Sequence, residues 1–262
     1  MVKVKDIVSY FENICPFSLC EEWDNVGLLI GSEENEVKKI LVCLDVDKYV
    51  AEEAAKCGAN LIISHHPVIF HPMKKITEKD ESAVITLIKN DISVFSAHTN
   101  LDVATGGLND YLAKKLGLKN TEILVPTGEY NKKTVGYGRA ASLENPISFG
   151  EIIKSTAKIL GAQNLRYVGD TKRMIGKIAV NSGGGASMAD ACFEKEVDLY
   201  ITGDFKYSSA RDCAEKGLCI IDAGHYETEI IACEWFAEKL NEKFDLEVIK
   251  SKKNVNVIKY LR

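Results

Sequence analysis

Three histidines and one carboxylate follow apolar runs in the first part of the chain. His65 and His66 directly follow one such run, and His98 and Asp102 follow the next. If both runs are parallel strands, their carboxyl ends meet at one edge of a sheet, where ligands bind. A single histidine after a strand is usually structural. The adjacent pair is harder to explain that way, because two neighbouring imidazoles at a strand end lower the stability of the fold unless something binds them.

A second pair of polar side chains stands near the end of the chain. His225 and Glu229 are four residues apart where a helix is expected to begin, so both side chains can point towards one place. A surface His–Glu pair at this spacing is common, and alone it is weak evidence for a metal.

Together, these residues form a mixed set of imidazole and carboxylate ligands. Such a set suits zinc, manganese or ferrous iron. Five ligands are too many for one closed tetrahedral zinc. They suit two divalent metals about 3.5–4 Å apart that share a carboxylate and lower the pKa of bound water. The sequence therefore points towards hydrolysis at a site made by His65, His66, Asp102, His225 and Glu229.

The remaining polar features leave alternatives open. The segment 182–185 (SGGG) is either an anion-binding loop or a structural tight turn. Asp204 is a candidate for orienting a histidine, and His98 either does the same or contacts substrate. His71 is assigned a local structural role.

Alternating apolar runs and amphipathic stretches predict an α/β fold with mainly parallel strands. The predicted strands are 39–46, 61–64, 92–96, 134–142, 164–168, 177–180, 198–202, 218–221, 246–249 and 255–260. The predicted helices are 47–57, 80–89, 107–116, 147–160, 186–195, 206–216 and 228–244.

The predicted organisation is two similar α/β halves around the metal site. The first half is 1–125, a short middle lobe or insertion is 126–172, and the second half is 173–262. The halves share an order of strand, polar cluster, helix, strand and polar cluster, which either reflects an internal duplication or is coincidental.

Composition narrows the class of protein. The chain has 262 residues and a net charge of −5, which argues against general nucleic-acid binding. The sequence has neither a signal peptide nor an apolar run long enough for a membrane helix, so a cytoplasmic location is expected. The eight cysteines include no Cys-x-x-Cys, and reduced, mostly buried thiols are expected.

Six motifs in this order resemble one known family. They are EWDNVGL at 22–28, SHHP at 64–67, HTNLD at 98–102, SGG at 182–184, TGD at 202–204 and GHxxxE at 224–229. The set resembles the GTP cyclohydrolase I type 2 homologue family, also called dinuclear metal centre or Nif-three-like proteins, over nearly the whole chain.

The resemblance implies a Nif-three-like fold and a dinuclear site at the five matching residues, with Glu229 as the bridging ligand. It also implies a ring-shaped homohexamer and a small-molecule substrate, with GTP as the leading candidate. The implied reaction is hydrolytic opening of the GTP imidazole ring with release of formate, with His98 as a proton shuttle.

Other functions use the same ligands. One alternative is a phosphoester hydrolase, and another is a non-enzymatic metal-binding regulatory or metal-chaperone protein. In a third, the metals hold an oligomer together. The product released from a nucleotide, and the ease with which metal is exchanged, separate these alternatives.

Overall fold

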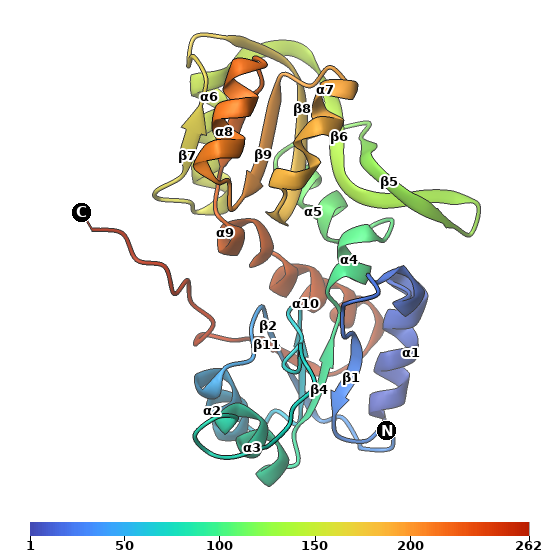
Figure 1. The fold of residues 1–262 in the computed structure, drawn as a ribbon. Helices are drawn as coiled ribbons and strands as arrows, with labels where there is room; N and C mark the ends of the chain where they lie inside the picture. Colours follow the sequence, from blue (N-terminus) through green and yellow to red (C-terminus); the bar gives the residue numbers. More distant parts are fainter. Residues whose placement is uncertain (262) are drawn as a thin grey trace. The chain divides into compact units, whose positions relative to one another are not determined.

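The computed structural model describes residues 1–261 and divides the chain into two compact units, each built around one β-sheet (Figure 1). Unit 1 comprises Met1–Ala104 and Ala232–Lys259, and unit 2 comprises Thr105–Ile231 with Tyr260 and Leu261. The expected α/β class with two sheet-bearing halves is therefore confirmed. The bounds differ from the expected segments, because residues 126–172 supply strands of the unit 2 sheet and the last long helix belongs to unit 1.

The sheet of unit 1 has five strands in the order β1-β4-β3-β2-β11. Its strands are β1 (Gly27–Ile30), β2 (Lys39–Cys43), β3 (Leu61–Ser64), β4 (Ser93–Ser96) and β11 (Glu247–Lys250). All neighbours pair in parallel except β1 with β4. The register places Cys43 beside Ser64 and Ser64 beside Ser96, so β2, β3 and β4 end level with one another. The residues that follow these strands consequently emerge at one edge of the sheet.

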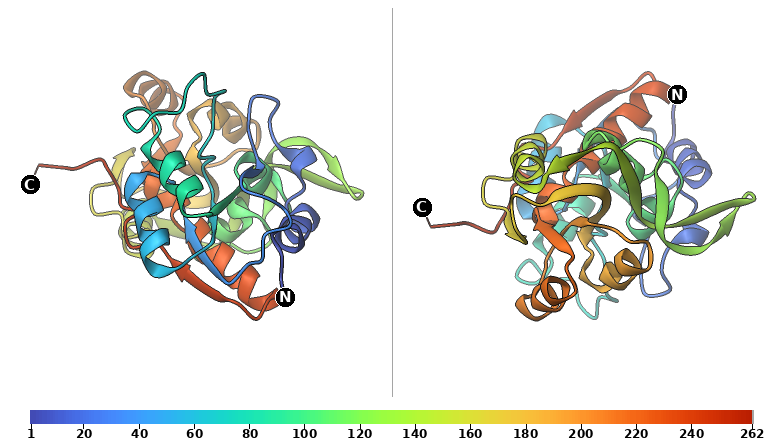
Figure 2. Two further views of the ribbon diagram at one scale, coloured as in Figure 1. Left: turned by 90° about the horizontal axis from the view of Figure 1, so that it is seen from below. Right: turned by 90° about the horizontal axis from the view of Figure 1, so that it is seen from above.

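Helices cover both faces of this sheet, which explains why its strands are apolar throughout. They are α1 (Val4–Ile14), α2 (Lys48–Cys57), α3 (Ser82–Lys89), the short α4 (Thr99–Val103) and α10 (Ala232–Lys243). Helices α2 and α3 lie side by side (Figures 1 and 2) and bury Leu41, Ile62 and Val94. On α1, Phe11 stacks on Phe95 of β4 with ring centroids 5.1 Å apart, and it also contacts Phe236 of α10.

The sheet of unit 2 has six strands in the order β5-β6-β8-β9-β10-β7. They are β5 (Glu122–Tyr130), β6 (Lys133–Ser148), β7 (Arg166–Val168), β8 (Met174–Gly184), β9 (Leu199–Gly203) and β10 (Cys219–Asp222). The central strands β8, β9 and β10 are parallel, whereas β5, β6 and β7 join them in antiparallel pairs. This sheet is therefore mixed, while the sheet of unit 1 fits the expectation of mainly parallel strands.

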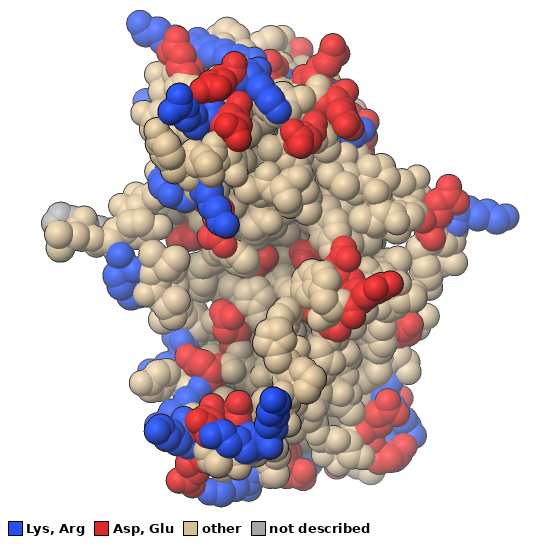
Figure 3. Space-filling view, viewed as in Figure 1, with Lys and Arg blue, Asp and Glu red and all other residues tan. Residues whose placement is uncertain are grey.

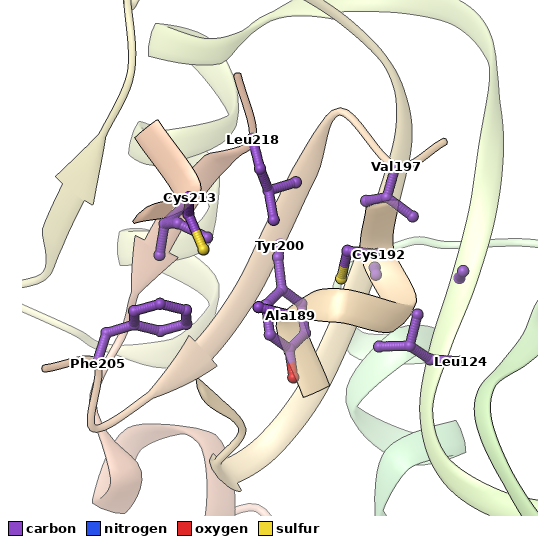
Figure 4. Packing of buried hydrophobic residues seen from close by; sticks show 11 residues of the cluster. Leu124, Ala189, Cys192, Val197, Tyr200, Phe205, Cys213 and Leu218 are labelled. Atoms are coloured by element: carbon purple, nitrogen blue, oxygen red, sulfur yellow. The ribbon is translucent and has the colours of Figure 1, made fainter. Parts of the chain in front are cut away.

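Buried Tyr200 is at the centre of the apolar core of unit 2, among residues of several elements (Figure 4). The helices of this unit are α5 (Leu108–Lys115), α6 (Phe149–Leu160), α7 (Ala189–Glu194), α8 (Tyr207–Glu215) and the short α9 (His225–Glu229). The Tyr200 hydroxyl donates a 2.9 Å hydrogen bond to the carbonyl of Gly185, which follows β8. This bond joins the start of β9 to the residue that follows β8.

Most predicted elements are present within a few residues, and the differences have local causes. The predicted helix 228–244 is interrupted, giving α9 and α10, and the predicted strand 255–260 is absent from the described residues. The strand predicted at 134–142 continues to Ser148, where the Ser148 side chain caps α6 as expected. Strands β1 and β5 and the helix α4 were not predicted, because they are short or carry polar residues.

Acidic and basic side chains are interspersed on the face of each unit shown in Figure 3. Among the described residues, no helix combines the length and apolar character needed to cross a membrane.

Asp198, just before β9, makes side-chain contacts that hold neighbouring strands of unit 2 together. Its carboxylate accepts hydrogen bonds from the amides of Gly176 and Lys177 at 2.8 and 2.9 Å and from Arg173 at 2.8 Å. Burial alone would raise its pKa, but these donors outweigh burial and lower the pKa of Asp198 below its ordinary value of 3.8. The ionised carboxylate therefore stabilises the fold.

We predict that Asp198→Ala lowers the free energy of unfolding by about 1–3 kcal/mol at pH 7. A depressed folded-state pKa contributes stability above the unfolded-state value and loses it as the pH falls through the folded value. The difference between wild type and variant should therefore shrink below about pH 4, as measured by urea unfolding. Asp190→Ala, which removes an exposed carboxylate of the same unit, is the control. A difference that is constant between pH 7 and pH 3 would contradict this account.

Candidate metal centre

The pair His65–His66 is held at the end of β3 by an extension of the sheet. The amides of His65 and His66 donate to the carbonyls of Cys43 and Leu44, at 3.3 and 2.9 Å. The Ser64 hydroxyl donates to the carbonyl of His66 at 2.8 Å and also contacts the Ser96 hydroxyl. The backbone that carries both imidazoles is therefore fixed by bonds to two neighbouring strands.

Each imidazole of this pair is bonded to a partner through Nδ1. In His65, Nδ1 lies 2.9 Å from the carbonyl of Ala97, and in His66 it lies 2.7 Å from Oδ1 of Asp45. A carbonyl or carboxylate at Nδ1 fixes the tautomer in which Nε2 carries the lone pair, as is usual for histidines that bind metals. His65 is completely buried, so its ring has a single orientation.

His98 is held in the same way by a carboxylate that the sequence analysis did not identify. Its Nδ1 lies 2.9 Å from Oδ1 of Asp24, whose side chain is fully buried. Oδ2 of Asp24 accepts hydrogen bonds from the hydroxyl and the amide of Thr99, at 2.5 and 3.1 Å. Burial acts to raise the pKa of Asp24, but the bonds with His98 and Thr99 lower the pKa to about 2. Asp24 is therefore an anion at neutral pH and holds the His98 ring through Nδ1.

These three histidines come together in unit 1. One potential ligand atom from each of His65, His66 and His98 lies within 4.8 Å of the others. Asp102, on α4, is buried, and its Oδ1 lies 3.9 Å from Nε2 of His65. This separation is longer than a hydrogen bond. Three imidazoles and a carboxylate at such distances fit a divalent metal of the zinc, iron or manganese type.

Unit 2 brings together the second predicted pair. On α9, Nε2 of His225 lies 2.8 Å from Oε2 of buried Glu229, while its Nδ1 lies 2.8 Å from Oδ2 of Asp204. The expected contact of Asp204 with a histidine is thus present. The bond to Glu229 raises the pKa of His225 to about 9, and Asp204 contributes in the same direction. The excess of negative charge around this imidazole suits a divalent cation.

Glycines in two strands of unit 2 make room for these side chains. At Gly183, where φ is +62°, an added Cβ would lie 2.0 Å from Oε1 of Glu229 and 3.3 Å from Nε2 of His225. At Gly203, an added Cβ would lie 2.6 Å from the backbone nitrogen of His225. The backbone approaches the two functional residues so closely that larger side chains would displace them.

The structure favours one of the two interpretations of the segment 182–185. The amide of Ser182 donates to Oδ1 of Asn109, and the amide of Gly183 donates to the hydroxyl of Thr228, both at 3.0 Å. These two amides are therefore used within unit 2 and not presented to an anion. The segment continues β8 to Gly184, and Gly183 within it makes the close approach to α9.

Asp222 is a further supporting residue that the sequence analysis missed. It ends β10, and its carboxylate accepts hydrogen bonds from the amides of Phe205 and Gly224, at 3.0 and 3.2 Å. These amides flank Asp204 and His225. Arg166 of β7 pairs with the same carboxylate. Asp24, Asp45 and Asp222 are each distant in sequence from at least one of the groups they hold, so spacing alone could not identify them.

His71 does not belong to the cluster in unit 1. Its ring lies against Phe70, with centroids 4.7 Å apart, in an exposed segment. This position agrees with the local role expected from the sequence.

The substitution Gly183→Ala tests whether the close approach of the β8 backbone to α9 positions the candidate ligands. We expect metal affinity to fall by about 10- to 100-fold, because the new methyl group would displace Glu229. Calorimetric titration with Mn²⁺ measures the change. Gly161→Ala is a matched control, since Gly161 has a similar φ of +67° but nothing within 4 Å of an added Cβ. Both variants share the backbone strain, so equal Mn²⁺ affinities for the two would contradict this role.

Comparison with solved structures gives matches that extend over nearly the whole chain. A Staphylococcus aureus protein, SA1388, superposes with a TM-score of 0.91 and 29% identity over 99% of both chains. Reduced HcgD from Methanocaldococcus jannaschii gives a TM-score of 0.82 with 34% identity, covering 96% of this chain and 98% of that one.

Sequence relatives agree with this result. A protein of Clostridium perfringens named GTP cyclohydrolase 1 type 2 homolog is 39% identical over 249 residues, which are 94% of each chain. One of Methanocaldococcus jannaschii with the same name is 33% identical, over 95% of this chain and 98% of its own. The family described as Duf34/NIF3 (NGG1p interacting factor 3) matches residues 2–256. The chain therefore belongs to the Duf34/NIF3 family.

Proposed function

We propose that the protein is a hydrolase that depends on two divalent metals and acts on a nucleotide or a related heterocycle. His65, His66, Asp102, His225 and Glu229 would hold the metals, and the family resemblance makes Glu229 the shared ligand. The observation that carries this proposal is a hydrogen bond that the imidazoles have in common. His65, His66 and His225 are each bonded at Nδ1 to a carbonyl or carboxylate, as metal-binding histidines are.

The donor set favours a catalytic centre over a structural one. It mixes imidazole with carboxylate and lacks thiolate, whereas many structural zinc sites contain cysteine. The described cysteines are all free, and six of the eight are buried. Bound divalent metals would supply Lewis acidity and lower the pKa of water at the site.

His98 is the proposed proton carrier. The anionic Asp24 holds its Nδ1, which leaves Nε2 of the ring available. The role proposed for Nε2 is to accept a proton and later donate it during hydrolysis. The ring is half-buried and lies within the cluster of imidazoles, so this proton would be held beside the reacting atoms.

The leading substrate is GTP, and the proposed reaction is hydrolysis of its imidazole ring with release of formate. The support for GTP is the printed name of the relatives, GTP cyclohydrolase 1 type 2 homolog, together with the ligand set. We also propose the hexameric ring implied by the family resemblance and the cytoplasmic location expected from the sequence.

The test is formate release from GTP by anaerobically metal-reconstituted protein. We expect formate from the wild type and a loss of more than about 100-fold in Glu229→Gln, because an uncharged amide is a poor bridging ligand. Glu215→Gln, an exposed substitution on α8, is the matched control and should keep full activity.

Phosphate in place of formate would identify a phosphoester hydrolase. If metal-loaded protein released neither product, and surrendered its metal readily to a competing apoprotein, a metal-chaperone role would replace the proposal.

A further inference from the structure

An exposed pair of aromatic rings lies beside the imidazole cluster of unit 1. Trp23 is 58% exposed and Phe70 is 40% exposed, with ring centroids 5.9 Å apart. The His98 ring lies 6.2 Å from Trp23 and 6.4 Å from Phe70. We call Trp23 and Phe70 the aromatic shelf.

Trp23 and Phe70 are exposed, whereas three other large rings of unit 1 are buried. Trp235, the other tryptophan, is 2% exposed, and Phe11 and Phe95 are fully buried. Exposing an indole to water forfeits the free energy of its burial. Two exposed rings that lie together offer an apolar surface on which a small flat ligand can lie.

The shelf is held in place by hydrogen bonds. The side-chain amide of Asn25 donates to the carbonyl of Ile69 at 2.5 Å, which joins the loop that carries Trp23 to the loop that carries Phe70. The amide of Glu21 donates to the Thr99 hydroxyl at 3.0 Å, and buried Asp24 bonds to His98 and Thr99. The backbone at Trp23 is therefore fixed to the segment that carries His98.

The shelf continues directly into the proposed reaction site. The His98 ring is 5.4 Å from His66 and 5.1 Å from His65, so it separates the shelf from the proposed metal ligands by one ring. A flat molecule that lies on Trp23 would consequently present one edge to His98. A site for hydrolysing a heterocycle needs this arrangement, in which the ring is held while its edge reacts.

We propose that the aromatic shelf binds the planar heterocycle of the substrate, a purine-type ring that stacks on Trp23 with Phe70 beside it. This assignment rests on the proposed function and specifies how that site selects its substrate. Indole and purine both have extended π-faces, and stacking of a base on an aromatic side chain changes affinity by roughly 5- to 150-fold. Two rings offer too little area for a stable protein interface, which favours a small flat ligand.

The fluorescence of the two tryptophans provides a measurement of ligand stacking. Trp23 is exposed and Trp235 is buried, so a stacked ligand should quench the fluorescence of Trp23 alone. In the metal-reconstituted full chain, we expect quenching by GTP and by guanosine, and none by inorganic tripolyphosphate at the same concentration. Trp23→Leu should abolish the quenching and raise the calorimetric Kd for GTP by roughly 10- to 100-fold.

Two further variants complete the experiment. Phe70→Leu keeps Trp23 as the reporter and should weaken guanosine binding by a few-fold. Tyr49→Leu is the matched control, because Tyr49 is a 63% exposed aromatic residue of the same unit on α2, and it should change neither quenching nor Kd. Thermal unfolding checks that Trp23→Leu is folded, and if it is not, Phe70→Leu alone decides.

The outcomes distinguish a failure of the proposed aromatic shelf from a failure of the proposed reaction. Guanosine quenching that depends on Trp23 supports the shelf even if no formate is released from GTP. Formate release with an unchanged Kd in Trp23→Leu would retain the proposed function and overturn the shelf. Quenching by tripolyphosphate equal to that by guanosine would also overturn it, because the binding would then depend on phosphate and not on the ring.

Discussion

The hydrogen bond at Nδ1 of each functional imidazole is the interaction on which the candidate centre depends. Its partner is the Ala97 carbonyl for His65 and a carboxylate, Asp45, for His66. In unit 2, Asp204 plays the same part for His225. Each bond fixes both the orientation of a ring and its tautomer. Without them, the imidazoles would rotate and the ligand atoms would no longer converge.

These bonds form because the sheets place distant segments side by side. In unit 1, the level ends of β3 and β4 bring Ala97 against His65. In unit 2, the parallel pairing of β9 and β10 aligns Asp222 with Thr202, so the loops that follow carry Asp204 and His225 next to each other. The buried apolar residues that stabilise each sheet therefore also determine where the ligands lie.

The sequence predicted the fold class and provided candidate ligands, but it did not identify the side chains that hold those ligands. Short apolar runs followed by histidines identify β3 and the imidazole pair, and the spacing of His225 and Glu229 matches one turn of α9. Asp24 could not be assigned in this way, because its contact with His98 spans 74 residues and depends on tertiary packing. The break between α9 and α10 was missed because the apolar pattern continues across it.

The proposed function requires that the five candidate ligands hold two metals about 3.5–4 Å apart. Electron paramagnetic resonance of Mn²⁺-loaded protein tests this directly, because two Mn²⁺ ions at that distance are spin-coupled. We predict two Mn²⁺ ions per chain with a coupled spectrum that is lost in Glu229→Gln. Two ions per chain that give only the six-line signal of isolated Mn²⁺ would contradict a shared dinuclear centre.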